Sequence, residues 1–279
     1  NRGKFKTPVI ESTGTGGGMK LFCQGVGSGH PDVSNASRAM KSSEWENCRK
    51  NGVTEIIEVA FGNDGIAFAN SVKSRKLNLT RKQLWQALAE HGPRPQKWSE
   101  IDPALPNSKI TVLVPPPTSG TRDAWNSLVM KKGCPDAVLK KDKKACEMLR
   151  EDGAAVEAGE NDTLIVQKLE ANPAAFGIFG FSYLENNRDK IQAATIEGVE
   201  ISLDSIQDYS YPVARPLFFY VKKAHIGVIP GLQEYLAEFT SDNAIGEEGY
   251  LIDTGLVPLE SGQLSKLKAD ARNLVTMQK

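Results

Sequence analysis

The sequence predicts an α/β protein with a mostly parallel sheet, because strand-like and helix-like segments alternate along most of its 279 residues. A chain of this length can bury a large core, so it forms one large domain or two lobes. Its composition, 40% hydrophobic and 24% charged, is that of an ordinary globular protein. None of its apolar runs reaches the roughly eighteen residues that a membrane helix needs.

In the first half of the chain, apolar and β-branched residues predict strands at residues 6–11, 32–37, 54–61 and 66–70. The turn sequence from Gly62 to Gly65 separates the last two. Helices are expected at residues 19–25, 43–50 and 80–91. Asn51-Gly52 suits a helix C-cap, and Thr80 with Gln83 forms a capping box.

In the second half, a Pro-rich connector precedes an apolar strand at residues 109–114. Two more apolar strands are expected at residues 175–181 and 216–222. Helical patterns cover residues 123–132, 163–171, 231–240 and 263–275, with Asp162 as the N-cap of the second.

The charges of the chain balance, with 34 Lys and Arg against 34 Asp and Glu. Neutrality argues against a nucleic-acid partner, which usually requires a basic face, and against long-range steering of anions. The basic start of the chain is followed by no apolar segment, so it does not form a signal peptide. The protein is therefore cytosolic, or a leader has been removed.

The four cysteines are Cys23, Cys48, Cys134 and Cys146. No C-x-x-C pair and only three histidines are present, so no metal site is expected. The even number predicts two disulfides, and local pairing in sequence order is the simplest of three connectivities. Disulfides indicate an oxidising compartment; the alternative is four buried free thiols.

Three turns rich in small and hydroxyl residues predict an oxyanion site. They are residues 11–18, 34–38 and 118–122, each placed between a predicted strand and a predicted helix start. Glycine allows close backbone approach, and the N–H groups of a helix N-terminus point outward. Arg38 and Arg122 add guanidinium groups that can donate paired hydrogen bonds to an oxyanion. Together these residues suit phosphate or sulfate. Ordinary turns and caps are the alternative, since no P-loop or complete dinucleotide motif occurs.

Catalytic patterns are scarce. No G-x-S-x-G elbow is present. The three histidines, His30, His91 and His225, are expected to be structural or solvated, as are the neighbouring carboxylates Glu247 and Glu248. No catalytic residue and no cofactor is therefore expected.

The chain resembles the phosphate-binding proteins of ABC importers. The resemblance lies in Glu11-Ser12-Thr13-Gly14-Thr15-Gly16-Gly17-Gly18, Asn35-Ala36-Ser37-Arg38, Asp64-Gly65-Ile66, Thr118-Ser119-Gly120-Thr121-Arg122-Asp123 and Gly177-Ile178-Phe179-Gly180-Phe181. It implies a two-lobed periplasmic-binding-protein fold, each lobe a mostly parallel sheet flanked by helices, with phosphate clamped in the cleft. Residues 1–69 and 218–279 would form lobe one, and residues 70–217 lobe two. Hinges would lie near residues 67–70 and 216–220.

The resemblance also implies the ligand-binding residues. Lobe one would contribute Thr13, Thr15, Gly16, Ser37 and Arg38, and lobe two would contribute Ser119, Gly120, Thr121 and Arg122. The implied partners are inorganic phosphate and a membrane ABC permease, for a monomeric periplasmic protein that binds no nucleic acid. The rival functions are binding of sulfate or molybdate, a phosphatase-like enzyme on the same fold, and a scaffold that has lost its ligand.

Two features depart from the family pattern. Such proteins usually open with a strand and a Gly-Ser-Ser/Thr loop that touches phosphate, so we expect a leader and an N-terminal strand upstream of the given sequence. Some members also carry Asp where this chain has Arg38, and Arg at the position of Pro115. That Asp accepts the proton of hydrogen phosphate. Asp64 is the candidate for this role here, its alternative being a turn residue.

Overall fold

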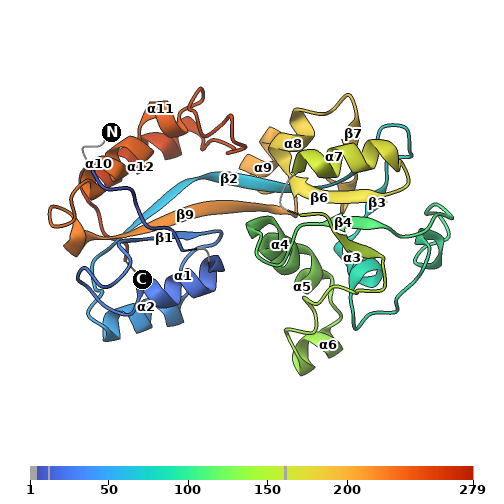
Figure 1. Cartoon of the computed structure of the whole chain (residues 1–279), viewed down its shortest axis with the longest axis horizontal. Helices are drawn as coiled ribbons and strands as arrows, with labels where there is room; N and C mark the ends of the chain where they lie inside the picture. The colour runs from blue at the N-terminus through green and yellow to red at the C-terminus, as the bar shows by residue number, and fades with distance from the viewer. Residues whose placement is uncertain (1–4, 12, 160–161, 279) are drawn as a thin grey trace. The chain divides into compact units, whose positions relative to one another are not determined.

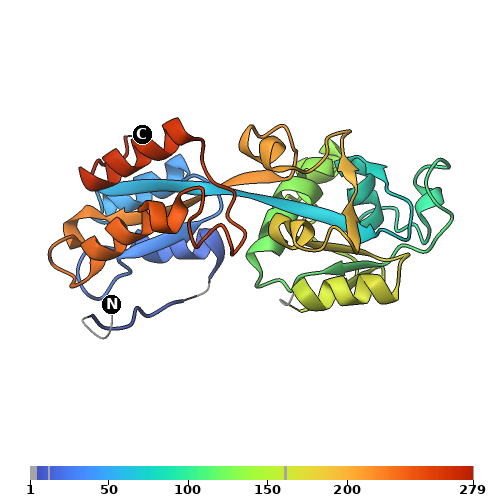
Figure 2. The same cartoon turned by 90° about the horizontal axis from the view of Figure 1, so that it is seen from above.

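The computed structural model describes residues 5–11, 13–159 and 162–278. The chain divides into two compact units, Asn1–Asn63 with Arg215–Lys279 (unit 1) and Asp64–Ala214 (unit 2). Strand β2 (Ile56–Ser71) carries the chain from unit 1 into unit 2, and β9 (Ala214–Lys222) carries it back (Figure 2). The boundaries expected from the sequence, at residues 69/70 and 217/218, fall in the same two strands.

Unit 1 contains β1 (Val33–Ala36), β9 and the first half of β2. Helices cover both faces of these strands (Figure 1). On one face lie α1 (Gly14–Phe22) and α2 (Ser42–Lys50). On the other lie α10 (Leu232–Phe239), α11 (Asp242–Ile245) and α12 (Ser261–Arg272). A short 3-10 turn, η3 (Lys223–His225), follows β9.

Successive side chains of β9 pack into two different core clusters of unit 1, on opposite faces of the strand. Phe218 and Tyr220 pack in the cluster that includes Phe22 of α1. Phe219 and Val221 pack in a second cluster with residues of α10 and α12. Because both faces of the strand are covered, its sequence is a continuous apolar run rather than an alternating one.

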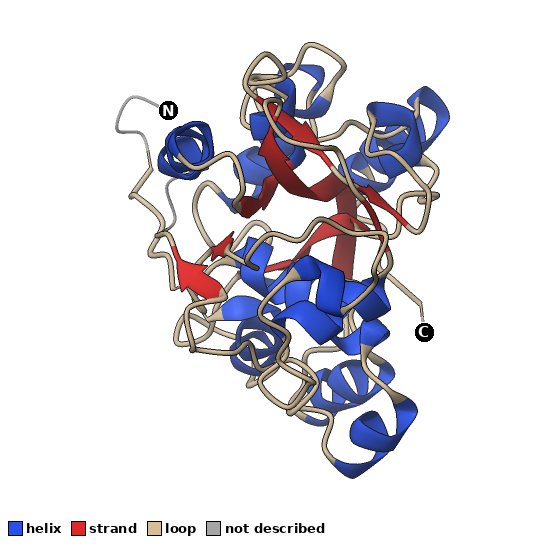
Figure 3. Ribbon diagram, turned by 90° about the vertical axis from the view of Figure 1, so that its right-hand side faces the viewer, coloured by secondary structure: helices blue, strands red, loops and turns tan. Residues whose placement is uncertain are grey.

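Unit 2 contains the second half of β2 and a sheet around β4 and β6, with helices on both sides (Figures 1 and 3). Its other strands are β3 (Asn78–Leu79), β4 (Val112–Val114), β5 (Ala155–Glu157), β6 (Phe176–Gly180), β7 (Ile191–Ala193) and β8 (Thr195–Ile196). Its helices are α3 (Arg81–Leu88), η1 (Trp98–Glu100), α4 (Gly120–Trp125), η2 (Asn126–Met130), α5 (Lys131–Gly133), α6 (Asp136–Lys141), α7 (Asp162–Ala171), α8 (Phe181–Glu185) and α9 (Leu203–Gln207). Phe68 and Phe176 stack at 4.7 Å between ring centroids, and Trp98 and Trp125 pack against Phe68.

The predicted α/β class is confirmed, but the sheet is mixed rather than mostly parallel. β4 runs parallel to β5 and β6, and β3 runs parallel to β8. β1 pairs antiparallel with β9, and β2 pairs antiparallel with β6 and β7. The expectation was wrong for these strands because it assumed that a helix crossover joins each successive pair of strands.

The predicted break at residues 62–65 was also wrong, since β2 continues through it. Gly62 and Gly65 do not form a turn; other side chains pack so closely against them that a Cβ would not fit. A Cβ on Gly62 would lie 2.5 Å from Leu256 Cδ1, and one on Gly65 would lie 2.4 Å from Ile206 Cδ1. Asn63 exchanges backbone hydrogen bonds with Val257, which keeps the segment extended.

The predicted strand at residues 6–11 is not formed. Pro8 has no N–H to donate, and Val9 and Ile10 are 93% and 88% exposed, so no partner covers this segment. The first helix begins at Gly14 instead of residue 19. The capping box of α3 is confirmed, because Thr80 Oγ1 accepts from the N–H of Gln83 at 3.1 Å and Gln83 Oε1 accepts from the N–H of Thr80. Ser12 and the side chain of Asp162 lie outside the described residues.

Both predicted disulfides are confirmed. Cys23 is bonded to Cys48, which joins α1 to α2, and Cys134 is bonded to Cys146. Across the described ranges, no helix combines the length and apolar character that a bilayer crossing requires.

A buried lysine holds the loop that follows α1. Lys222 Nζ donates to Gly25 O at 2.5 Å and lies 5.0 Å from the centre of the Phe22 ring. Burial lowers the pKa of Lys222 to about 8, against the opposing attraction of Asp32. Asp32 also contacts His225 Nδ1 at 2.6 Å, and the N–H of Gly27 donates to His225 Nε2 at 2.9 Å, so polar contacts tie this loop to the end of β9.

We expect this lysine to make unit 1 more stable as the pH rises. Between pH 8 and its ordinary pKa of 10.5, the unfolded chain binds more protons at Lys222 than the folded protein does. The free energy of unfolding therefore increases, by roughly 2 kcal/mol between about pH 8 and pH 10. Chemical denaturation across this window should show the rise in the wild type and not in Lys222→Met. The neighbouring Lys223→Met is the control, and a rise that persists in Lys222→Met would contradict the assignment.

Candidate functional site

The N-terminus of α1 is the first part of the candidate site. Thr13 is its N-cap residue, but the Thr13 side chain makes no capping hydrogen bond. Gly14 begins the helix at φ +65°, and no acidic residue occupies the first turn. The first N–H groups of a helix have no partner within the helix, so this end of α1 is suited to an anion.

Thr15 and Ser37 are brought together by the fold. The N–H of Ser37 donates to Thr15 Oγ1 at 3.1 Å, and the two hydroxyl oxygens lie 3.0 Å apart. Thr15 is 9% exposed, so its hydroxyl mainly positions the loop after β1. Ser37 lies in that loop and not at a helix start as expected, because α2 begins only at Ser42.

Arg38 is held by a carboxylate in the same unit. Its Nη1 and Nη2 donate to Glu44 Oε2 and Oε1 at 2.9 and 2.7 Å, and Nη1 also donates to Ala39 O. Burial would raise the pKa of Glu44, but the hydrogen bonds from Arg38 and from the N–H of Lys41 hold it below its usual value. Arg38 is therefore half of an ion pair, and its partner Glu44 was not predicted from the sequence.

Tyr220 is a further residue of this region that sequence reasoning missed. Its hydroxyl donates to Glu58 Oε2 at 2.8 Å and accepts from the N–H of Met40 at 2.7 Å. Burial, and then the neighbouring Glu58, raise the pKa of Tyr220, so the hydroxyl keeps its proton. Because Met40 follows Arg38 by two residues, this pair of bonds fixes the loop that carries Ser37 and Arg38.

Removing the Tyr220 hydroxyl should loosen that loop. Tyr220→Phe leaves a buried N–H and a carboxylate unpaired, which costs about 1–3 kcal/mol of the free energy of unfolding. Affinity for phosphate, the ligand that the resemblance implies, should fall several-fold in parallel when it is measured by calorimetry. Tyr235→Phe in α10 is the control, because Tyr235 is 39% exposed. Equal effects of the two variants would contradict a positioning role for Tyr220.

Two adjacent glycines of α1 make a matched test of the local geometry. No atom lies within 4 Å of a Cβ built on Gly16, whereas one on Gly17 would lie 2.8 Å from Thr13 Cβ. Alanine favours a helix over glycine by up to about 1 kcal/mol. Gly16→Ala should therefore raise the melting temperature of the free protein and, as a predicted ligand contact, weaken phosphate binding. Gly17→Ala should lower the melting temperature, and the reverse order would contradict this geometry.

In unit 2, the turn after β4 has the predicted strand, turn and helix arrangement. Ser119 is the N-cap of α4, and its Oγ accepts from the N–H of Thr121 at 3.2 Å. Gly120 and Thr121 form the first helical positions. The helix continues through η2, a π-helical segment, into α5. Such segments occur frequently at functional sites.

Arg122 has unused hydrogen-bonding capacity. Among the described residues, its hydrogen bond runs from Nη1 to Pro115 O at 2.9 Å, while its buried Nε has no partner. Burial lowers the pKa of Arg122, and the carboxylate of Glu157 opposes this effect. Arginine remains charged at neutral pH, so the half-buried guanidinium is a cation with several free donors.

The structure places the remaining predicted residue, Asp64, inside a strand. Asp64 is half-buried in β2, so the alternative interpretation as a turn residue was wrong. Thr13, Thr15, Gly16, Ser37 and Arg38 belong to unit 1, whereas Asp64 and residues 119–122 belong to unit 2.

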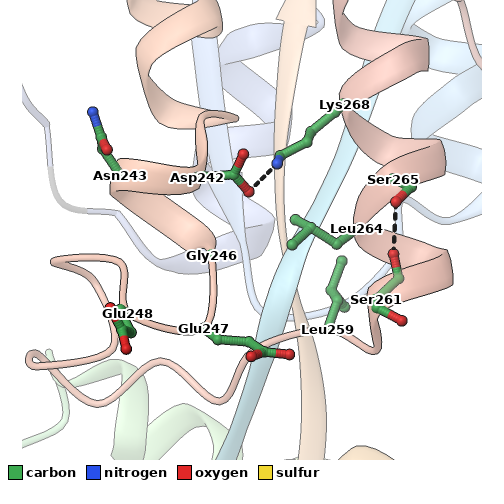
Figure 4. A pocket seen from close by; sticks show the side chains of 10 residues that line it. All are labelled: Asp242, Asn243, Gly246, Glu247, Glu248, Leu259, Ser261, Leu264, Ser265 and Lys268. Carbon is green, nitrogen blue, oxygen red and sulfur yellow. Dashed lines mark hydrogen bonds and ion pairs between the residues drawn. The ribbon is translucent and has the colours of Figure 1, made fainter.

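A separate hollow of about 550 Å³ lies in unit 1 between α11 and α12 (Figure 4). Lys268 Nζ forms an ion pair with Asp242 across it, and Glu247, Glu248 and Ser261 also line it. None of the predicted site residues contributes to its wall. In the part of the chain that the structure describes, no group of three or more His, Cys, Asp or Glu side chains could hold a metal ion.

Comparison with known proteins shows which family the chain belongs to. The family model of a PBP superfamily domain matches residues 3–243. The chain belongs to the PBP superfamily. Its similarity extends to the protein SphX of Synechococcus elongatus, with 30% identity over 239 residues, 81% of this chain and 64% of SphX. The phosphate-binding protein PstS of Staphylococcus saprophyticus is 28% identical over 254 residues, 89% of this chain and 70% of that protein. The chain thus spans less than two thirds of the length of SphX.

Solved structures support the fold of this PBP superfamily member. A possible phosphate binding protein from Planctomyces limnophilus has a TM-score of 0.75 at 24% identity, covering 94% of this chain and 86% of its own. A substrate-binding protein with bound phosphate from Clostridium perfringens has a TM-score of 0.58 at 21% identity, covering 87% and 84%. At these identities the likeness establishes the two-lobed fold alone.

Proposed function

We propose that this PBP superfamily chain binds inorganic phosphate and delivers it to a membrane ABC permease. The observation that carries the proposal is Arg122, a half-buried cation with an unpartnered Nε in a turn of small and hydroxyl residues. The likeness to PstS, whose name describes phosphate binding, supports the same ligand.

The donors proposed for phosphate come from both units. Unit 1 offers the uncapped start of α1 with Thr13, Thr15 and Gly16, followed by Ser37 and Arg38. Unit 2 offers Ser119, Gly120, Thr121 and Arg122. A charge-assisted hydrogen bond contributes roughly 1.5–3 kcal/mol, so a handful of them, less desolvation, reach about −8 kcal/mol, in the micromolar range.

No covalent step is part of the proposal. Oxyanion binding requires only fixed donors, and we propose that the chain is a binding protein and not an enzyme. We further propose a monomer that works outside the cytoplasm, which is consistent with two disulfides.

We propose that Asp64 accepts the proton of hydrogen phosphate. Sulfate has no proton to donate at neutral pH, so it would leave the Asp64 carboxylate facing an oxyanion without a hydrogen bond. The half-buried carboxylate would then face a second anion without a hydrogen bond between them, which disfavours sulfate.

Titration calorimetry with phosphate, sulfate and molybdate tests the function. The expected result is micromolar or tighter phosphate binding that excess sulfate does not displace. Asp64→Asn should weaken phosphate binding and reduce the preference over sulfate. Tighter binding of sulfate or molybdate would overturn the ligand assignment, absence of binding of all three would support a scaffold, and turnover of a chromogenic phosphate ester would support an enzyme.

A further inference from the structure

A basic loop in unit 2 stands out against the neutral chain. Residues 131–147 contain six lysines and three acidic residues, a net charge of +3, within a chain whose net charge is +0. The Cys134–Cys146 disulfide closes the loop at its base. We refer to the segment between these two cysteines, together with Lys131 and Lys132, as the lysine loop.

The lysine loop projects from the body of unit 2. Its helix α6 has no buried residue, and Figure 1 shows α6 beyond α5, on the side away from β4 and β6. A helix that packs no side chain into a core contributes little to the stability of the fold. The disulfide holds the segment in place instead.

Four of the lysines have uncompensated charge. The exposed side chains Lys140, Lys141, Lys143 and Lys144 take part in none of the ion pairs found among the described residues. By contrast, Lys131 lies 3.4 Å from Glu147. The Asp142 carboxylate accepts from the backbone N–H of Lys144 and so serves the turn.

The composition of the lysine loop favours a lipid surface over other anionic partners. The segment contains no aromatic residue and no arginine. Protein interfaces are depleted in lysine and enriched in aromatic residues and arginine, and proteins that bind single-stranded nucleic acids combine basic residues with aromatic stacking. A diffuse layer of anionic headgroups needs only clustered point charges, each worth about fivefold in affinity.

We propose that the lysine loop docks this protein on anionic phospholipid membranes. The uncompensated lysines would supply the attraction, and the disulfide would keep them together at one projecting tip. The proposal does not depend on the phosphate site, because the loop contains none of the residues proposed to bind phosphate. It would raise the local concentration of the protein at the surface where a permease is embedded.

Vesicle sedimentation tests the proposal with the full chain. The wild type should bind phosphatidylcholine vesicles that contain phosphatidylglycerol at low salt, more weakly at physiological salt, and not bind phosphatidylcholine alone. The variant K140E/K141E/K143E/K144E should bind the anionic vesicles at least several hundredfold more weakly, because it removes and reverses four charges worth about fivefold each. Its phosphate affinity should equal that of the wild type, which separates this result from a failure of the phosphate proposal.

A charge-matched variant controls for net charge. K73E/K97E/K109E/K168E reverses four other exposed lysines that take part in no described ion pair, and it should retain vesicle binding. Because reversal at Lys140 and Lys141 also disfavours the end of α6, the glutamine variants K140Q/K141Q/K143Q/K144Q and K73Q/K97Q/K109Q/K168Q repeat the comparison. Equal losses in the loop and control variants, equal binding to neutral vesicles, absence of wild-type binding, or tighter binding to DNA than to vesicles would each overturn the proposal.

Discussion

Replacing Arg122 by alanine is expected to weaken phosphate binding by about a hundredfold, the loss of roughly two charge-assisted hydrogen bonds less partial compensation by water. The guanidinium is half-buried, its Nε has no partner, and Pro115 O accepts its described hydrogen bond. A cation kept from water without full pairing costs free energy in the unliganded protein. Phosphate would remove that cost, so calorimetry on the variant should show the loss directly.

The fold of the Arg122→Ala variant should remain intact. Within the described part of the chain, the side chain donates to a single carbonyl, so the melting temperature without phosphate should change by no more than a few degrees. Arg188→Ala is the matched control in the same unit, because Arg188 is exposed and pairs with Glu185. Unchanged phosphate affinity in Arg122→Ala would contradict the site assignment.

Replacing Arg38 by alanine is expected to have a smaller effect than replacing Arg122, because Arg38 already forms an ion pair. Glu44 already balances the charge of Arg38 through two hydrogen bonds, so Arg38→Ala should weaken phosphate binding less than Arg122→Ala does. We expect a loss of about tenfold, since part of it comes from the loosened loop and only part from the lost charge. A larger loss at Arg38 would mean that the guanidinium exchanges Glu44 for the ligand.

Local sequence patterns predicted the parts of the fold that depend on neighbouring residues. The Thr80–Gln83 capping box places both partners within three residues, and it is formed. The apolar run at residues 216–222 predicted a strand, and β9 forms there. Its residues are apolar because helices cover both of its faces.

The parts that could not be predicted depend on residues far apart in the chain. Gly62 and Gly65 resembled a turn, but Leu256 and Ile206 pack against them and explain why a side chain is excluded. Likewise, the Tyr220 hydroxyl joins Met40 and Glu58 across long sequence separations. A single sequence shows which residue types are present but not which of them contact each other. It therefore identified candidate ligand-binding residues without the residues that hold them in place.

Removing the Cys23–Cys48 disulfide is expected to cause the largest loss of stability. A disulfide stabilises the folded protein by restricting the unfolded chain. This contribution is about 3.5 kcal/mol for the 25-residue separation of Cys23 and Cys48, and about 3 kcal/mol for the 12-residue separation of Cys134 and Cys146. Cys23 and Cys48 are also 1% and 0% exposed, and both lie in the core cluster with Phe22. Their replacement by alanine therefore adds the cost of a cavity to the loss of the cross-link.

The variants that lack one disulfide each serve as controls for one another. Urea unfolding of C23A/C48A and C134A/C146A should show the larger loss in the first variant. Phosphate affinity should also fall only in the first, because Cys23 ends α1, whose other end is proposed to bind the ligand. The second bond closes a projecting loop whose helix buries no side chain. Cys134 and Cys146 are themselves 7% and 0% exposed, so C134A/C146A should also lose some core packing, but it should spare the phosphate site. A larger loss of stability in C134A/C146A would mean that the lysine loop contributes to the core of its unit, against the exposure of α6.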